Sequence, residues 1–426
     1  MGPGVTPSGQ TTAPERSKAA WHDLRMSILA RTPLSLGDLR RDLSFSAVFS
    51  GFLAMFVGLS GTLALLFSAA KSSHLTAAQT SSWVMSVCVA IGVTGLVLSW
   101  VYRAPVVTAF STPGLALLAS DMNRFSYADV IGALIVTALV VTVLGFSGLY
   151  ARLVERIPSA VAAAVLAGIL LPFALGVFRA LPSSPLLVGL MVATYLVARR
   201  FAARYAVPLA LLIGLIVAGF TGSFTGAAFA WTLPSLVFTA PSFSLSATLV
   251  LALPMTILAL ASQHLPGLAV MKASGFGRVP ATPLVGVTGL ASLLSASFGA
   301  HTTTLAAITA AICAGPEAHP EPSKRYVAGL ASGASYLLAA LAGGVLAGAF
   351  ALLPPALLAA LAGLALTGSL LSSLEASLRE AAWREVALLT LVVTASGVTF
   401  LGVGSAFWGI VVGLAATLVL RPGRTA

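Results

Sequence analysis

Charged residues are scarce in this sequence. Its 426 residues include only 35 Asp, Glu, Lys and Arg, and twelve of these lie in the first 43 and the last six residues. Soluble domains carry about a quarter of their residues as charges, whereas here 8% are charged, 58% are hydrophobic and the mean hydropathy is +1.00. This composition excludes a soluble globular protein and a disordered chain. It predicts an all-α polytopic membrane protein.

Other groups needed for common chemistries are also missing. The two cysteines, Cys88 and Cys313, both lie in apolar segments, so neither a disulfide framework nor a metal site is expected. No carboxylate pair or Gly-x-Ser-x-Gly motif lies within an apolar run, which argues against an enzyme, and nothing suggests a cofactor. The net charge of +11 does not predict a nucleic-acid partner, because the basic residues are scattered and not clustered.

The gaps between charges predict fourteen transmembrane segments. A span needs about 20 apolar residues, and the charge-free runs provide them at 44–70, 72–102, 104–120, 130–151, 157–178 and 180–198, twice within 205–271, and twice within each of 279–316, 326–374 and 386–420. If the tails 1–43 and 421–426 are cytoplasmic, the inside segments collect 20 of the 23 Lys and Arg. The positive-inside rule predicts that bias, so count and orientation support each other.

An internal repeat is visible in the same runs. The segment that begins at Ile157 matches the one that begins at Leu353, and the segment 110–118 matches 300–308, where Thr112 aligns with Thr302. Seven spans in each half is an odd number, so the two halves are predicted to be inverted repeats, an architecture of secondary transporters.

Spans three and ten share an unusual pattern. We expect an extended stretch, at 104–110 and at 296–300, followed by a helix too short to cross the membrane. Ser111 or Thr112 would cap the first helix with Pro113 in its first turn, and the polar residues 301–304 would do the same for the second. Two such half-helices would direct their positive dipole ends into the protein interior, where they could bind an anion without a basic side chain.

Two histidines, His264 and His301, are predicted at membrane depth and are the candidates for a coupled proton, because the unperturbed pKa of histidine is about 6.5. Burial disfavours a protonated imidazole and a bound anion favours it, so proton and anion would bind cooperatively. Gln263 could bind a carboxylate or orient a histidine. Ser60 is a small polar residue in span one, and Phe110 could offer an aromatic wall.

Several motifs resemble the bacterial benzoate/proton symporter family. They are Ser111-Thr-Pro-Gly114, Gln263-His-Leu-Pro-Gly267 and Phe298-Gly-Ala-His-Thr302, together with the stretch that runs on to Pro320. The resemblance covers the chain from about Leu43 to Leu420. One departure is that Ser262 and His264 stand where we expect asparagines in the family motif, which adds a group that can titrate.

The resemblance implies a fold of seven-plus-seven inverted repeats, shared with uracil permeases and sulfate/anion exchangers. A core domain (44–151 and 246–350, spans 1–4 and 8–11) would slide like an elevator against a gate domain (152–245 and 351–420, spans 5–7 and 12–14), often in a homodimer. The implied substrate site comprises Phe110, Ser111, Thr112, Gly114, Gln263, His264, Ala300, His301, Thr302, Thr303 and Ser60, with His301 and His264 in proton coupling.

The sequence therefore predicts a protein of the bacterial inner membrane that imports benzoate, or a related aromatic carboxylate, together with protons. Two alternatives stay open. The first is a transporter of another small anion or of a nucleobase on the same fold. The second is a passive anion channel, although channels usually need a continuous polar pore lining.

Overall fold

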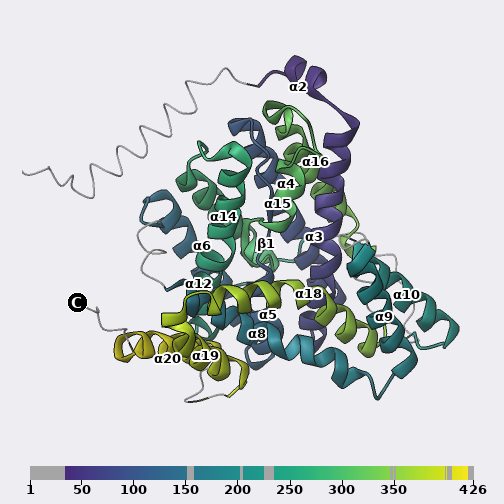
Figure 1. Cartoon of the computed structure of the whole chain (residues 1–426), viewed down its shortest axis with the longest axis vertical. Helices are drawn as coiled ribbons and strands as arrows, with labels where there is room; N and C mark the ends of the chain where they lie inside the picture. The colour runs from purple at the N-terminus through teal and green to yellow at the C-terminus, as the bar shows by residue number, and fades with distance from the viewer. Residues whose placement is uncertain are drawn as a thin grey trace, which may run out of the picture.

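The computed structural model describes residues 34–420 apart from 151–157, 202–204, 225–234, 346–348, 350–351, 399 and 401–404. In this part the chain is mostly helical (Figure 1). Seven helices are long and apolar enough to cross a membrane: α3 (Phe45–Ser72), α4 (Ala77–Tyr102), α6 (Tyr127–Phe146), α8 (Ser159–Ala180), the continuous helix Leu245–Met271, the helix Ala281–Phe298 and α18 (Pro355–Leu378).

Shorter helices occupy the other predicted segments. They are α5 (Thr112–Asp121), α9 (Pro185–Phe201), α10 (Ala206–Phe220), α15 (Ile308–Ala314), α16 (Tyr326–Leu341), α19 (Arg384–Ala395) and α20 (Ser405–Val419). Each of the fourteen predicted segments thus contains a helix. Whether all fourteen cross the bilayer stays a prediction.

Polar side chains fix where several helices begin. Ser44 caps α3 and Ser126 caps α6, each by accepting a hydrogen bond from a backbone N–H of the first turn. Thr76 and Gln79 form a reciprocal capping box at the start of α4. These caps lie at the ends of the apolar runs, which is why charge gaps locate the helices well.

The helix Leu245–Met271 has an irregular backbone. Two π-helical stretches, η3 (Thr248–Ala252) and η4 (Leu258–His264), alternate with α11 (Leu245–Ala247), α12 (Leu253–Ile257) and α13 (Leu265–Met271), and the π-helical η5 (Lys272–Phe276) follows. Pro254 and Pro266 each lack the N–H that a regular helix would use. π-turns are rare and concentrate at functional sites, and here η4 ends at His264.

A two-stranded antiparallel sheet lies among the helices. Strand β1 (Thr108–Phe110) pairs with β2 (Thr303–Leu305), with Ala109 opposite Thr304. The backbone N–H groups of Ser111 and Ala306 extend the ladder to the carbonyls of Thr302 and Val107, at 2.8 and 2.9 Å. The sheet therefore joins segments from the two halves of the chain.

The expected extended stretch at 296–300 is wrong. Residues Ala296–Phe298 form the 3-10 helix η6 at the end of α14 (Ala281–Ser295), and Gly299 turns the chain with φ of +96°. The strand begins only at Thr303, because the run Thr302-Thr303-Thr304 is β-branched and favours extended backbone.

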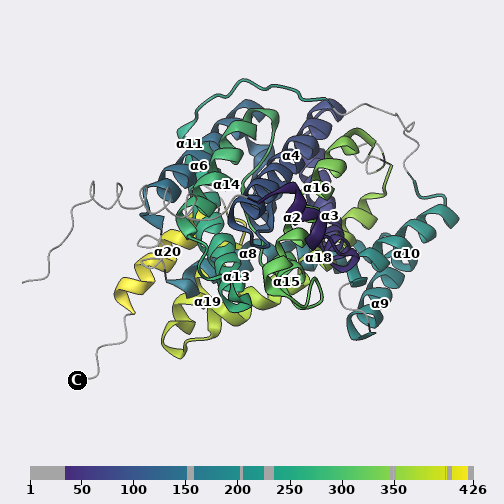
Figure 2. The same ribbon diagram turned by 90° about the horizontal axis from the view of Figure 1, so that it is seen from above.

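The helices pack in two groups. Helix α16 packs against α3 and α4, and α14 packs against α6. Helix α8 packs against α18 and α19, while α9 packs against α10. In Figure 1 the first group surrounds β1 and the second forms a row on the other side of the molecule, and Figure 2 shows α9 and α10 projecting from it. The division into a core and a gate domain, implied by the family resemblance, stays a prediction, and so does their relative movement.

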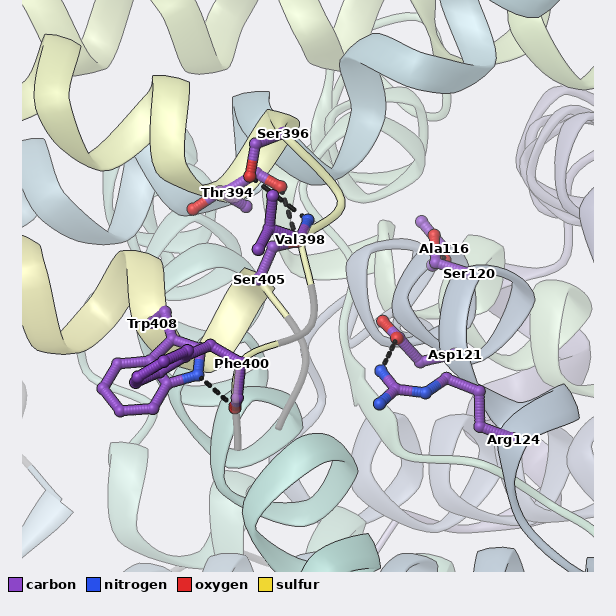
Figure 3. A network of polar contacts seen from close by, with 10 residues as sticks. All are labelled: Ala116, Ser120, Asp121, Arg124, Thr394, Ser396, Val398, Phe400, Ser405 and Trp408. Atoms are coloured by element: carbon purple, nitrogen blue, oxygen red, sulfur yellow. Dashed lines mark hydrogen bonds and ion pairs between the residues drawn. The ribbon is translucent and has the colours of Figure 1, made fainter. Parts of the chain in front are cut away.

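Polar contacts hold the ends of both groups (Figure 3). After α5, Arg124 forms an ion pair with Asp121 at 2.9 Å. Between α19 and α20, the Ser405 hydroxyl donates to the carbonyl of Thr394 at 2.8 Å and the Trp408 indole to that of Phe400 at 3.0 Å. The Thr394 carbonyl belongs to the last turn of α19, where carbonyls have no partner within the helix.

Candidate substrate site

The candidate site is built around Phe110, the last residue of β1. Phe110 is directly opposite Thr303 of β2, and opposed residues of an antiparallel pair direct their side chains to the same face of the sheet. Both side chains are buried, with exposed fractions of 3% and 0%. An aromatic ring and a threonine hydroxyl from opposite halves of the chain therefore share one interior face.

Two more aromatic side chains with polar atoms surround this ring. The His301 ring lies 5.8 Å from that of Phe110, centroid to centroid, and the Tyr336 ring of α16 lies 6.3 Å away, edge to face. His301 and Tyr336 are 0% and 1% exposed. We call Phe110, His301, Thr303 and Tyr336 the Phe110 cluster.

Three polar atoms of this cluster lack partners. Nε2 of His301, Oγ1 of Thr303 and the hydroxyl of Tyr336 are buried and make no hydrogen bond in the described structure. A buried polar group without a partner costs about 1–3 kcal/mol, and such groups are rare in native proteins. Three of them around one aromatic ring indicate a site that a ligand completes.

The other nitrogen of His301 is occupied. The indole N–H of Trp83, on α4, donates to Nδ1 of His301 at 3.0 Å, and the two rings meet edge to face. Trp83 is 1% exposed. In the described structure the imidazole thus has a hydrogen-bond partner at Nδ1 and none at Nε2.

The start of α5 lies next to the cluster and is capped as predicted. The Ser111 hydroxyl accepts from the Gly114 N–H at 3.1 Å, and the Ser111 carbonyl accepts from Leu115. Pro113 has no N–H. In the described structure the Thr112 amide is therefore the N–H of the first turn that remains for a ligand. Helix α5 thus has fewer free N–H donors for an anion than an uncapped helix would have.

The corresponding expectation for residues 301–304 is wrong. They precede and form β2 instead of capping a helix, and α15 begins only at Ile308. Ala307 stands at its N-cap position and has no side-chain oxygen to offer. Thr302 and Ala300 are buried beside the sheet, where the Thr302 carbonyl accepts from Ser111.

His264 lies in a different environment from His301. It ends η4, is fully buried, and both of its ring nitrogens lack partners in the described structure. The Tyr150 ring lies 6.2 Å away, and its hydroxyl donates to the Leu260 carbonyl of the π-turn at 3.1 Å. Among the described residues no hydrogen bond or ring contact joins His264 to His301.

The remaining predicted residues are placed as follows. Gln263 is half-buried in η4. Gly267 lets α13 approach β2, because a Cβ there would lie 2.6 Å from Cβ of Leu305. Ser60 belongs to α3, and its side chain lies outside the described part of the structure. In the described residues no group of three or more His, Cys, Asp or Glu could hold a metal ion.

The sequence interpretation missed Trp83 and Tyr336. The predicted residues are histidine, amide, hydroxyl and small residues, with Phe110 as the one aromatic hydrocarbon ring. Trp and Tyr inside a span each carry one polar atom that needs a partner, and that signal was available in the sequence.

Comparisons with known proteins agree with a transporter. Residues 41–419 match a family model described as the benzoate membrane transport protein. The benzoate membrane transport protein of Acinetobacter baylyi is 40% identical over 385 residues, which cover 90% of this chain and 98% of that protein. The inner membrane protein YdcO of Escherichia coli is 41% identical over 376 residues, covering 87% and 95%.

Solved structures show the same fold at low sequence identity. The structure of SLC26A9 superposes with a TM-score of 0.61 at 12% identity, covering 99% of this chain and 72% of that one. The transmembrane domain of the cyanobacterial bicarbonate transporter BicA superposes with a TM-score of 0.53 at 15% identity, covering 88% and 98%. The chain therefore has a membrane-transporter fold.

Proposed function

Because the chain belongs to the benzoate membrane transport protein family, we propose that it imports benzoate or a closely related aromatic carboxylate with protons across the bacterial inner membrane. The observation that carries the proposal is the Phe110 cluster, with an aromatic ring beside three buried polar atoms that lack partners. The apolar ring of an aromatic carboxylate can pack against Phe110, and its carboxylate group can accept hydrogen bonds from the three polar atoms.

Each residue of the cluster has a role in this proposal. The substrate ring packs against Phe110, in an offset or edge-to-face arrangement. The carboxylate accepts from the Tyr336 and Thr303 hydroxyls and from the His301 ring, and the Thr112 amide at the start of α5 adds a backbone donor. Hydrogen bonds to a charged acceptor contribute about 1.5–3 kcal/mol, so the site needs no basic side chain.

The cluster is fully buried, so the substrate reaches it only when the protein changes conformation. Its residues come from β1, from β2 and the segment just before it, and from α16, all within the predicted core domain. Helix α5 and the π-turn η4 both pack against α8 of the predicted gate. A core that carries the whole site past the gate, as in an elevator, accounts for this arrangement.

The spacing of elements supports the fourteen-span inverted repeat. Strands β1 and β2 begin at Thr108 and Thr303, which are 195 positions apart, and α8 and α18 begin at Ser159 and Pro355, 196 positions apart. The match of Ile157 with Leu353 has this spacing. Thr112 and Thr302 are 190 positions apart, five fewer than the strands, so this sequence match does not follow the structural repeat. Cytoplasmic termini and a homodimer stay predictions.

Coupling to protons requires a group that titrates with substrate. His264 and His301 are the two candidates, because both are buried in helices or loops of the predicted core and each has a ring nitrogen without a partner. Binding of an anion beside either imidazole favours its protonated form, which links proton and carboxylate thermodynamically.

The test is uptake of labelled benzoate by purified protein in proteoliposomes. With an outside pH lower than the inside pH, accumulation above the external concentration is expected, and a protonophore abolishes it. Neutral benzoic acid crosses bilayers unaided, so protein-free vesicles are measured in parallel and external pH is kept well above 4. Uptake no faster than in protein-free vesicles refutes the proposal.

Two competing functions predict other results in the same assay. A passive anion channel equilibrates benzoate without accumulation and ignores the pH gradient. A transporter of another small anion or of a nucleobase accumulates that compound, and benzoate does not compete with it.

A further inference from the structure

The hydrogen bond between Trp83 and His301 fixes which ring nitrogen carries the proton. An indole N–H is a donor only, so the nitrogen that it meets must be an acceptor. The Trp83 N–H lies 3.0 Å from Nδ1 of His301. The neutral imidazole therefore holds its hydrogen on Nε2, which is the nitrogen without a partner in the described structure.

The same bond opposes protonation of His301. An imidazolium ring carries N–H groups on both nitrogens, so a proton on Nδ1 would place two donors face to face. Both side chains are buried, so bulk solvent does not replace the lost bond. While the Trp83 bond is intact, His301 acts as a neutral Nε2–H donor.

Neighbouring contacts hold the two residues in this geometry. Ser82 and Ser86, on either side of Trp83, both donate to the Phe298 carbonyl, at 2.8 and 3.2 Å. Gly299 follows with φ of +96°, and a Cβ there would lie 3.3 Å from Cβ of Trp83. These contacts hold α4 and the turn that precedes His301 in a fixed position relative to each other.

We propose that Trp83 is a positioning residue, which fixes His301 as a neutral Nε2–H donor to the carboxylate of the substrate. This inference rests on the proposed function for the identity of the ligand. It assigns His301 to substrate recognition and leaves His264, whose ring nitrogens are both unoccupied, as the histidine that takes the coupled proton.

The first test needs no substitution. In wild-type protein labelled with ¹⁵N-histidine, His301 should show a bare Nδ1 and a protonated Nε2 near neutral pH, with the signals assigned by their loss in His301→Gln. The reverse tautomer or an imidazolium would overturn the proposal. A wild-type protein that shows the expected tautomer but binds no benzoate refutes the proposed substrate and leaves the hydrogen-bond assignment intact.

The second test removes only the donor. Trp83→Phe deletes the N–H but leaves a smaller ring, so benzothienylalanine introduced at position 83 serves as the isosteric variant. Either change should release Nδ1, give a mixture of tautomers and weaken benzoate binding about tenfold, as expected for loss of about 1.4 kcal/mol.

A double-substitution cycle separates positioning from packing. If Trp83 acts through His301, the change at position 83 should alter benzoate affinity less than about twofold when His301 is already Phe. An equal loss in both backgrounds would show that Trp83 contributes by packing alone and would overturn the proposal.

Discussion

Replacing Tyr336 by Phe should have opposite effects on the stability of the free protein and on substrate binding. The Tyr336 hydroxyl is buried without a partner, and its near neighbour is the backbone of α3, where a Cβ at Gly58 would lie 2.7 Å from the hydroxyl oxygen. Removing an unsatisfied buried hydroxyl recovers up to about 1–3 kcal/mol of desolvation cost, so the free protein should unfold at a higher temperature.

The same change should weaken benzoate binding. In the proposed site this hydroxyl donates to the carboxylate, and a hydrogen bond to a charged group contributes about 1.5–3 kcal/mol. The dissociation constant should therefore rise about 10- to 150-fold. Thermal unfolding of the purified protein, without and with benzoate, measures the first effect, and titration calorimetry measures the second.

Tyr326→Phe is the matched control. The Tyr326 hydroxyl donates to Asp42 of α2 (Leu36–Asp42) at 2.9 Å, so its removal should lower stability and leave benzoate affinity unchanged. If Tyr336→Phe destabilises the free protein, or if it leaves benzoate affinity within about twofold of wild type, the reasoning from unsatisfied donors is refuted.

Three further changes probe the surroundings of the site. Gly267→Ala should displace α13 from β2, lower thermal stability and abolish uptake. Gly176→Ala, where the added Cβ has open space, should change neither stability nor uptake. Normal uptake by Gly267→Ala would contradict the close approach of α13 to β2. Ser111→Ala should cost about 1 kcal/mol of stability through the lost cap of α5, while Ser111→Thr retains most of it, and thermal unfolding distinguishes them. Hydrogen bonds from the backbone and side chain of Ser35 lower the pKa of Asp38, so the start of α2 should be stabilised above about pH 4 and loosen as pH falls below it. Amide-exchange protection factors there that do not change with pH would disprove this.

The helices were largely predictable from the sequence, and the reason is physical. In a membrane protein the charged residues mark the ends of the apolar segments, and caps such as Ser44 and Ser126 stand at those ends. The pairing of β1 with β2 was not predictable in the same way. It depends on the register between segments about 195 residues apart, and no local pattern at either segment encodes that register.

The structure places some of the predicted site residues together, although their role in substrate binding stays a prediction. Ser111 capped α5 as its sequence context indicates, and Phe110 and His301 came together. Trp83 of α4 and Tyr336 of α16 lie beside them, and no sequence pattern indicates that these two helices meet at this point. Threonine can cap a helix and also favours a strand, so the sequence alone does not decide the structure of the three threonines at 302–304. Their β-branched side chains form a strand because β1 provides a partner.

The pairing of β1 with β2 also has a consequence for biogenesis. When the ribosome has inserted the first half of the chain, the backbone N–H and C=O groups of β1 have no strand beside them, because β2 lies almost two hundred residues further along. Unpaired backbone is costly within the bilayer core, and contacts between distant segments form slowly. The newly inserted first half therefore keeps the edge of β1 unpaired until β2 has been synthesised. Any insertase or chaperone that assists this protein should hold the first half longest, until Thr303–Leu305 has entered the membrane.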